Sequence, residues 1–440
     1  MAESIHKLSN SPLTRRKMLG MSSKAVLAGM ASGTVSYTAE KRPRIACIVT
    51  YWAAPGSHAD WIINKLLDGY WWESAHTPSR VDVVSVYIHQ LRDSELGQKV
   101  CKAKSIPIFN SVSEALTLGG KELAVDGVVL VGEHGNYHTN IRGQIYYPRW
   151  WLYQQIIEVF RRSNRSVPVF NDKHLSTDWD EAKWMYDQSR EMGFPLFGGS
   201  SIPFCHRTPE LELDLETPLR ASVVTAFGGK DYVHGIATLV CMAERRRGGE
   251  TGVAAVQCIE GPETWKWTDR NPWAGRLIEA ALATYRDRKP GNIRDTVPQP
   301  FVFIVEYRDG TKGAVYHLNG AGINQWAYAG DIEGRSEPLV IQTWFNFTPY
   351  GQYHAANAFE HWIIEMMVTG KEPVPAESLL LTTGIQSFVM NSNWENGKHY
   401  DVGRRIETPC LDMNYRAVRE SRFQRGSRPP VIQYIRGFEK

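Results

Sequence analysis

The sequence predicts an α/β protein in which a doubly wound parallel sheet is followed by an α+β unit with a largely antiparallel sheet. Short apolar runs alternate with amphipathic segments up to about residue 199, and longer strand-like runs replace them beyond residue 205. The chain has 440 residues, of which 42% are hydrophobic and 22% charged. This length and composition are typical of a globular protein with two sizeable cores.

The first half reads as strands and helices in alternation. Because each apolar run is continuous rather than alternating, we expect strands that are buried on both faces, as in a parallel sheet covered by helices. The expected strands are 45–49, 81–88, 125–131, 167–170 and 195–199, and the expected helices are 59–67, 150–161 and 180–192.

The second half changes pattern near residue 205. Arg308-Asp309-Gly310-Thr311 lies between two strand-like runs and is a hairpin turn signal, which favours antiparallel pairing. The expected strands are 223–226, 252–259, 301–307, 312–318 and 341–347, and the expected helices are 232–244, 273–285 and 355–368. We therefore divide the chain into residues 1–39, 40–204, 205–392 and a C-terminal arm, 393–440, whose last stretch, Arg416 to Lys440, we expect to be solvated.

Residues 1–39 have the layout of a twin-arginine export signal. Arg15 and Arg16 precede Met18-Leu19, and a weakly apolar run extends to Val35. The route that reads such signals carries folded proteins, so we expect export to the periplasm through it. This segment holds five basic residues and one acidic residue, so its formal net charge is +4. Because the whole chain carries +3, residues 40–440 carry −1.

The remaining composition argues against several classes of function. Without a basic excess beyond residue 39, nothing global indicates nucleic-acid binding. No run of about 18 apolar residues follows residue 40, so we expect no membrane span in the mature part. The six cysteines form no Cys-x-x-Cys pair, and His134 and His138 lie in a glycine-containing loop without helical spacing. We therefore predict no metal site.

Several short motifs occur in an order that resembles the Gfo/Idh/MocA dehydrogenases, the glucose–fructose oxidoreductase and inositol dehydrogenase type. They are Asn171-Asp172-Lys173-His174-Leu175-Ser176 after the predicted fifth strand, Glu133-His134-Gly135-Asn136-Tyr137-His138 after the fourth, Gly228-Gly229-Lys230-Asp231-Tyr232-Val233-His234, and a closing pattern over 369–384. The family's usual proline after the lysine is His174 here. The resemblance covers most of residues 44–392 and implies a Rossmann-like first domain with a second domain for substrate and oligomerisation.

The resemblance also implies a site. In that family a lysine bonds the substrate hydroxyl beside the nicotinamide, and a downstream His or Asp takes the hydroxyl proton as hydride leaves. The corresponding residues are Lys173, with His234 as the first candidate base and Asp231 as the second. Asp172 either orients the lysine or caps the next turn. Contacts to cofactor or substrate are then expected from Glu133, His134 and His138.

The loop after the first strand departs from the family. A dinucleotide-binding loop carries Gly-x-Gly-x-x-Gly so that the backbone approaches a pyrophosphate. Here Tyr51 and Trp52 stand in that loop with the single glycine Gly56. If these three residues contact NAD or NADP, binding should be weak or should require the loop to move.

Two functions therefore stay open from the sequence. One is an NAD(P)-dependent oxidoreductase that acts on a sugar, polyol or glycoside, and that would be a homo-oligomer if its open sheet packs face to face. The other is a non-catalytic carbohydrate-binding relative that has lost the dinucleotide.

The arginine pair gives a direct test of export. Replacing both Arg15 and Arg16 with lysine should stop export while leaving folding unchanged, because the signal is read by a receptor and not by the folded core. Cell fractionation follows the location, with Lys7→Arg as the control. Unchanged periplasmic delivery of the double variant would contradict the assignment.

Overall fold

The computed structural model describes residues 41–53, 56–322, 326–343 and 357–427. The predicted export signal, residues 1–39, lies outside the described residues. The chain divides into two compact units, Met1–Lys41 and Arg42–Lys440, and both sheets lie in the second.

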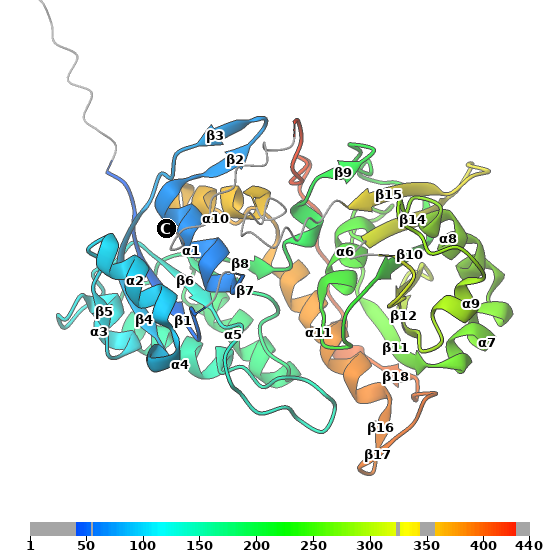
Figure 1. Ribbon diagram of the computed structural model, residues 1–440, viewed down its shortest axis with the longest axis horizontal. Helices are drawn as coiled ribbons and strands as arrows, with labels where there is room; N and C mark the ends of the chain where they lie inside the picture. Colours follow the sequence, from blue (N-terminus) through cyan, green and yellow to red (C-terminus); the bar gives the residue numbers. More distant parts are fainter. Residues whose placement is uncertain (1–40, 54–55, 323–325, 344–356, 428–440) are drawn as a thin grey trace, which may run out of the picture. The chain divides into compact units, whose positions relative to one another are not determined.

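The first sheet is wholly parallel and confirms the predicted doubly wound half. Its six strands run in the order β5-β4-β1-β6-β7-β8, which is the order of a dinucleotide-binding fold (Figure 1). The strands are β1 (Arg44–Val49), β4 (Asp82–Ile88), β5 (Ile108–Phe109), β6 (Gly127–Val131), β7 (Val169–Asp172) and β8 (Leu196–Gly199). A separate small hairpin joins β2 (Tyr70–Trp72) to β3 (Ala75–Thr77).

Helices cover both faces of this sheet. Ile45 and Cys47 of β1 face one core, whereas Ala46 and Ile48 face the other, as the two-residue period of a strand requires. The helices that connect its strands are α1 (His58–Asp68), α2 (Glu95–Ala103), α3 (Val112–Thr117), α4 (Arg149–Arg162) and α5 (Trp179–Glu191), with the 3-10 turns η1 (Leu91–Asp93) and η2 (Ile202–Phe204).

The second sheet is mixed but mostly antiparallel, as the sequence predicted. Eight strands run in the order β18-β11-β12-β13-β10-β14-β15-β9, and of these pairs only β10 and β13 are parallel. The strands are β9 (Arg207–Thr208), β10 (Leu219–Ala226), β11 (Val253–Glu260), β12 (Phe301–Tyr307), β13 (Lys312–His317), β14 (Trp326–Ile332), β15 (Leu339–Thr343) and β18 (Ile406–Glu407).

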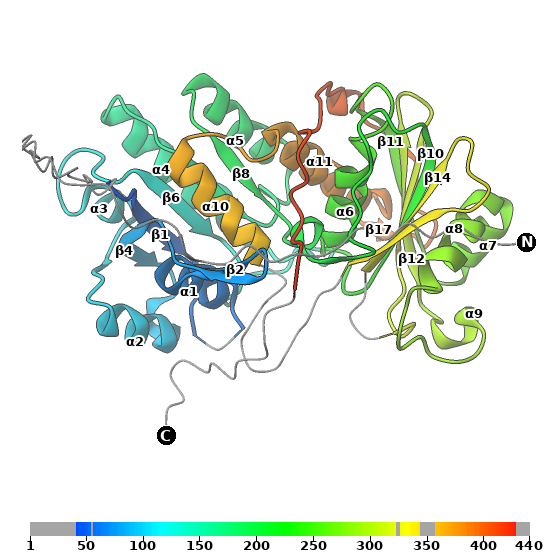
Figure 2. The ribbon, with the colours of Figure 1, turned by 90° about the horizontal axis from the view of Figure 1, so that it is seen from above.

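Both faces of the second sheet are also covered by helices of this chain (Figure 2). On one face lie α6 (His234–Ala243) and α11 (Ala376–Ser392). On the other lie α7 (Pro262–Arg270), α8 (Pro272–Leu282) and α9 (Ile293–Thr296). Helices of this chain thus cover the sheet face on which the expected homo-oligomer was argued, and the homo-oligomer stays a prediction.

The last helices return to the first sheet. Helix α10 (Asn357–Thr369) places Phe359 and Ile363 in the core formed by β1, α1 and α2, beside the β2–β3 hairpin. Helix α11 lies between the two sheets, where it contacts β8 and α5 of the first and β11 and α6 of the second. It is consequently buried on almost all sides, with no polar face of its own.

The prediction of a solvated C-terminal arm is wrong for the part of the arm that the structure describes. After β16 (Trp394–Glu395), β17 (Lys398–His399), β18 and η4 (Pro409–Leu411), the chain packs against the body. Arg245 donates to the carbonyls of Val418 and Arg419 at 2.8 and 3.2 Å, and Phe423 is 1% exposed. The backbone carbonyls of this segment satisfy buried arginine donors, which composition alone cannot indicate.

Among the described residues, every helix is too short or too polar to cross a membrane.

A buried histidine gives the second sheet a pH dependence. His317 ends β13, is 0% exposed and stacks on Phe301 with ring centroids 4.2 Å apart. Burial lowers the pKa of His317 to about 3, although the backbone of Gly228 slightly favours the charged ring. Because the unfolded histidine titrates near 6.5, its contribution to stability is complete above that pH and is lost as the pH falls.

We expect His317→Phe to remove about 2 kcal/mol of the difference in unfolding free energy between pH 7 and pH 5. Phenylalanine preserves the stack on Phe301 and carries no titratable group. Urea unfolding at the two pH values measures the change, with the exposed His76→Phe as the control. An unaltered pH dependence in His317→Phe would contradict the buried, neutral assignment.

Candidate functional site

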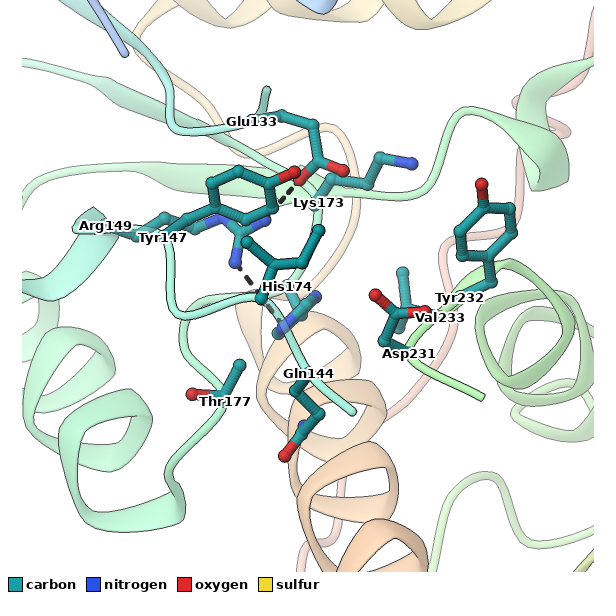
Figure 3. Close-up of a pocket in the computed structure, with 11 residues that line it drawn as sticks. Glu133, Gln144, Tyr147, Arg149, Lys173, His174, Thr177, Asp231, Tyr232 and Val233 are labelled. Carbon is teal, nitrogen blue, oxygen red and sulfur yellow. Dashed lines mark hydrogen bonds and ion pairs between the residues drawn. The ribbon is translucent and has the colours of Figure 1, made fainter. Parts of the chain in front are cut away.

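The candidate site lies at the carboxyl ends of the parallel strands, where such folds bind ligands. Glu133 follows β6, Lys173 follows β7, and Asp231 precedes α6 of the second sheet. These residues line one pocket whose empty space, including the part open to solvent, is about 330 Å³ (Figure 3).

Lys173 is held in an uncommon backbone conformation. Its φ is +64°, in the left-handed region that non-glycine residues rarely adopt. Its amide donates to the carbonyl of Gly199 in β8 at 3.1 Å, and Asn171 Nδ2 donates to the carbonyls of Asp172 and His174, each at 3.2 Å. Such strain costs about 1–3 kcal/mol and concentrates at functional sites.

Lys173 meets His234 at the first residue of α6. Lys173 Nζ donates to His234 Nε2 at 2.8 Å, and Ser200 Oγ lies 2.7 Å from His234 Nδ1. Since an ammonium group has no acceptor, Nε2 accepts, and the proton of the neutral ring resides on Nδ1, facing Ser200. Burial, followed by the charge of Lys173, holds the pKa of His234 well below its usual value.

Asp231 differs from His234 in its access to the pocket. Its carboxylate lines the pocket and, in Figure 3, points into it from the side opposite Glu133 and Lys173. Burial, and then the charge of Glu133, raise the pKa of Asp231. His234 lies behind Lys173 and does not line the pocket. Of the two candidate bases, Asp231 is therefore the one that a ligand in this pocket can reach.

Opposite Asp231, a buried arginine organises the pocket. Arg149, which begins α4, is 1% exposed, pairs with Glu133 and stacks over the Tyr147 ring at 5.0 Å. A Cβ on Gly132 would lie 2.5 Å from Arg149 Cγ, so glycine is required there for the arginine to pass. Burial would raise the pKa of Glu133, but Lys173 and Arg149 outweigh it and keep this carboxylate ionised.

A second acid–base pair lies at the start of α1. His58 Nδ1 is 2.6 Å from Asp172 Oδ2, so Asp172 does not pair with its neighbour Lys173 but with the first residue of α1. Burial raises the pKa of Asp172 to about 6 and lowers that of His58 well below normal. His134, predicted as a contact residue, has its ring centroid 5.0 Å from that of His58.

The residues predicted in the loop after β1 lie apart from the pocket. Trp52 is 0% exposed and packs against α2, where a Cβ on Gly97 would lie 3.0 Å from it. Its indole is therefore part of the core, contrary to the expectation that it contacts a cofactor. Tyr51 is half-buried, and Gly56 N donates to Asp60 Oδ2 at 3.2 Å. His138 is exposed and does not line the pocket.

Sequence reasoning did not identify His58, Arg149, Ser200 or Tyr147. A weak signal existed for two of them: His58 and Arg149 are cationic or potentially cationic residues at the first position of a helix, where the dipole disfavours positive charge. Each is offset by a carboxylate, Asp172 and Glu133 respectively. Ser200 and Tyr147 carry no such signal, because only the fold brings them to the site.

Within the described part of the chain, no group of three or more His, Cys, Asp or Glu side chains is arranged to hold a metal ion.

Several solved structures have a fold similar to that of this chain. No family model matches the chain, and no curated protein matches it in sequence. GenD2 from gentamicin A biosynthesis, solved with NAD, is 12% identical with a TM-score of 0.52, over 84% of this chain and 97% of its own. Lactobacillus casei myo-inositol dehydrogenase, solved with NAD(H) and myo-inositol, is 12% identical with a TM-score of 0.50, over 83% and 97% of the two chains.

A third solved structure agrees with these two. The apo scyllo-inositol dehydrogenase of Lactobacillus casei is 10% identical with a TM-score of 0.50, over 83% of this chain and 98% of its own. The sequence resemblance to dehydrogenases of the inositol dehydrogenase type is thus confirmed as a likeness of fold over both sheets.

Proposed function

We propose that this protein is an NAD(P)-dependent oxidoreductase that acts on a hydroxyl group of a sugar or polyol. The observation that carries the proposal is the Lys173 ammonium, held 2.8 Å from neutral His234 and lining the same pocket as Asp231. The fold supports it, because two solved proteins of this fold were captured with NAD or NAD(H), and one of them also with myo-inositol.

The chain supplies the proton chemistry of such a reaction. Lys173 keeps N–H groups beyond the one given to His234, and these donate to the substrate oxygen and stabilise negative charge there. Asp231 accepts the hydroxyl proton, since its carboxylate lines the pocket and its raised pKa strengthens it as a base. His234 positions Lys173. When bound, the oxidised nicotinamide would take the hydride from the carbon.

The pocket fits the nicotinamide end of this cofactor. Glu133 follows β6, which lies beside β1 where the strand order reverses, and Lys173 follows the next strand, β7. Their side chains are already oriented by Arg149 and His234. These residues would hold the nicotinamide ribose beside the substrate.

The remainder of the dinucleotide meets groups of the chain itself. The start of α1, where a pyrophosphate usually binds, is capped by Ser57 and Asp60, whose carboxylate accepts from Gly56 N at 3.2 Å. Beyond β4, where a ribose is usually bound, Gln90 exchanges two hydrogen bonds of 2.9 Å with the backbone of Asn136. Binding of the whole cofactor therefore requires the turn around Asn136, in the connection from β6 to α4, to move off Gln90 at the end of β4.

Turnover tests the proposed function. Purified protein with NAD+ or NADP+ should oxidise at least one member of a panel of sugars and polyols, followed at the absorbance of the reduced nicotinamide. Lys173→Met should lower kcat by about 100- to 10,000-fold, and Asp231→Asn should remove the acidic limb of the pH–rate profile. Lys183→Met, which removes an exposed lysine of α5, is the control. Folded protein that binds sugars without oxidising them would contradict the proposal and favour the carbohydrate-binding alternative.

The contact between Gln90 and Asn136 predicts a measurable effect on the cofactor. Gln90→Ala should tighten NAD+ binding by about tenfold to a hundredfold, because two hydrogen bonds no longer hold the connection against β4. Calorimetric titration of NAD+ and NADP+ measures this, with Gln98→Ala as control, since Gln98 also donates to a backbone carbonyl nearby. Equal affinities in wild type and Gln90→Ala would show that this contact does not oppose binding.

We retain export through the twin-arginine route as a proposal for residues 1–39.

A further inference from the structure

We propose that His174 is a specificity-determining residue that donates a hydrogen bond to a second oxygen of the substrate, next to the one that Lys173 binds. The inference rests on the proposed function and specifies the substrate class of the same pocket. His174 follows Lys173 directly in the chain and lines the same pocket.

The neighbour of His174 fixes where its proton lies. Arg149 Nη1 is 3.5 Å from His174 Nε2, and a guanidinium group donates but never accepts. Nε2 is therefore the acceptor, and the neutral ring carries its proton on Nδ1. Burial, and then the charges of Arg149 and Lys173, hold the pKa of His174 well below its usual value, so the ring is neutral at physiological pH.

This Nδ1–H donor has no partner. His174 is 6% exposed, and its Nδ1 has no hydrogen-bond partner among the residues that the structure describes. Buried donors are rarely left without acceptors, so this unpartnered donor at the pocket favours a ligand that brings an acceptor oxygen.

The backbone places His174 beside the reacting position. Lys173 and His174 are consecutive, Asn171 Nδ2 donates to the carbonyl of His174, and Leu175 N donates to Thr383 Oγ1 at 3.2 Å. In Figure 3 the His174 ring lies between Arg149 and Asp231. Lys173 and His174 thus address neighbouring atoms of one small ligand. The ligand class that fits is a vicinal diol or a hydroxyl next to a carbonyl.

Monodeoxy analogues test this assignment. The sugar or polyol that binds most tightly in a panel of myo-inositol, glucose, galactose and sorbitol is compared with each of its monodeoxy analogues, by calorimetry and by kcat/KM. With the analogue that lacks the oxygen bound by His174, the affinity and the kcat/KM of the wild type should each fall about tenfold. His174→Phe keeps a planar ring without a donor and should discriminate no longer, whereas His174→Asn places an amide donor near Nδ1 and should restore part of the preference. Circular dichroism and thermal unfolding establish that each variant is folded.

The outcomes separate the two proposals. Oxidation with undiminished discrimination in His174→Phe overturns the role of His174 and leaves the proposed function standing. Binding without oxidation overturns the proposed function. The dissociation constants of the monodeoxy analogues for wild type and His174→Phe then still decide whether His174 binds the second oxygen. If His174→Phe does not fold, the wild-type series and His174→Asn decide, and equal affinity of wild type for every monodeoxy analogue overturns the inference. Binding of no panel member overturns both.

Discussion

The hydrogen bond between Lys173 and His234 joins the two halves of the site. Lys173 follows β7, the fifth strand of the first sheet in chain order, and His234 begins a helix that packs on the second sheet. Its geometry depends on a left-handed backbone at Lys173, held by the Gly199 carbonyl, and on Ser200, which follows the neighbouring strand and bonds the far side of the imidazole. Three loops from two sheets therefore converge on one ammonium group.

Around this contact, the buried arginine has a carboxylate partner, whereas His174 and His234 stay neutral. Arg149 pairs with Glu133, and His58 Nδ1 lies 2.6 Å from Asp172 Oδ2. His174 and His234 are kept uncharged by burial and by adjacent cations. A low-dielectric site cannot hold unpaired charges cheaply, so these neutral rings provide hydrogen bonds without adding charge. Acidification would charge several of these rings beside Lys173 and Arg149.

The sequence predicted the fold class because its strands are apolar runs bounded by turns. Residues 301–307 were located at the same bounds as β12, whereas α11 was missed because it is buried by both sheets and shows no amphipathic period. At the site, Lys173, Asp231 and Asp172 were found from short motifs. His58 was missed because its partner is 114 positions away, and Trp52 was misread because burial against α2 depends on tertiary packing. Local patterns thus reveal residues next to strand ends, but not the partners that the fold supplies.

Helix α11 has a consequence for how the site opens. A single helix of 17 residues packs on β8 and α5 on one side and on β11 and α6 on the other, and it lies in the core of both. Rotating one sheet away from the other as a rigid body would expose apolar side chains on both sides of this helix at once. A hinge between the halves is therefore stiff, and access depends on smaller displacements, foremost that of the turn around Asn136. Ligand exchange would then depend on the displacement of this turn and not on the closure of whole domains.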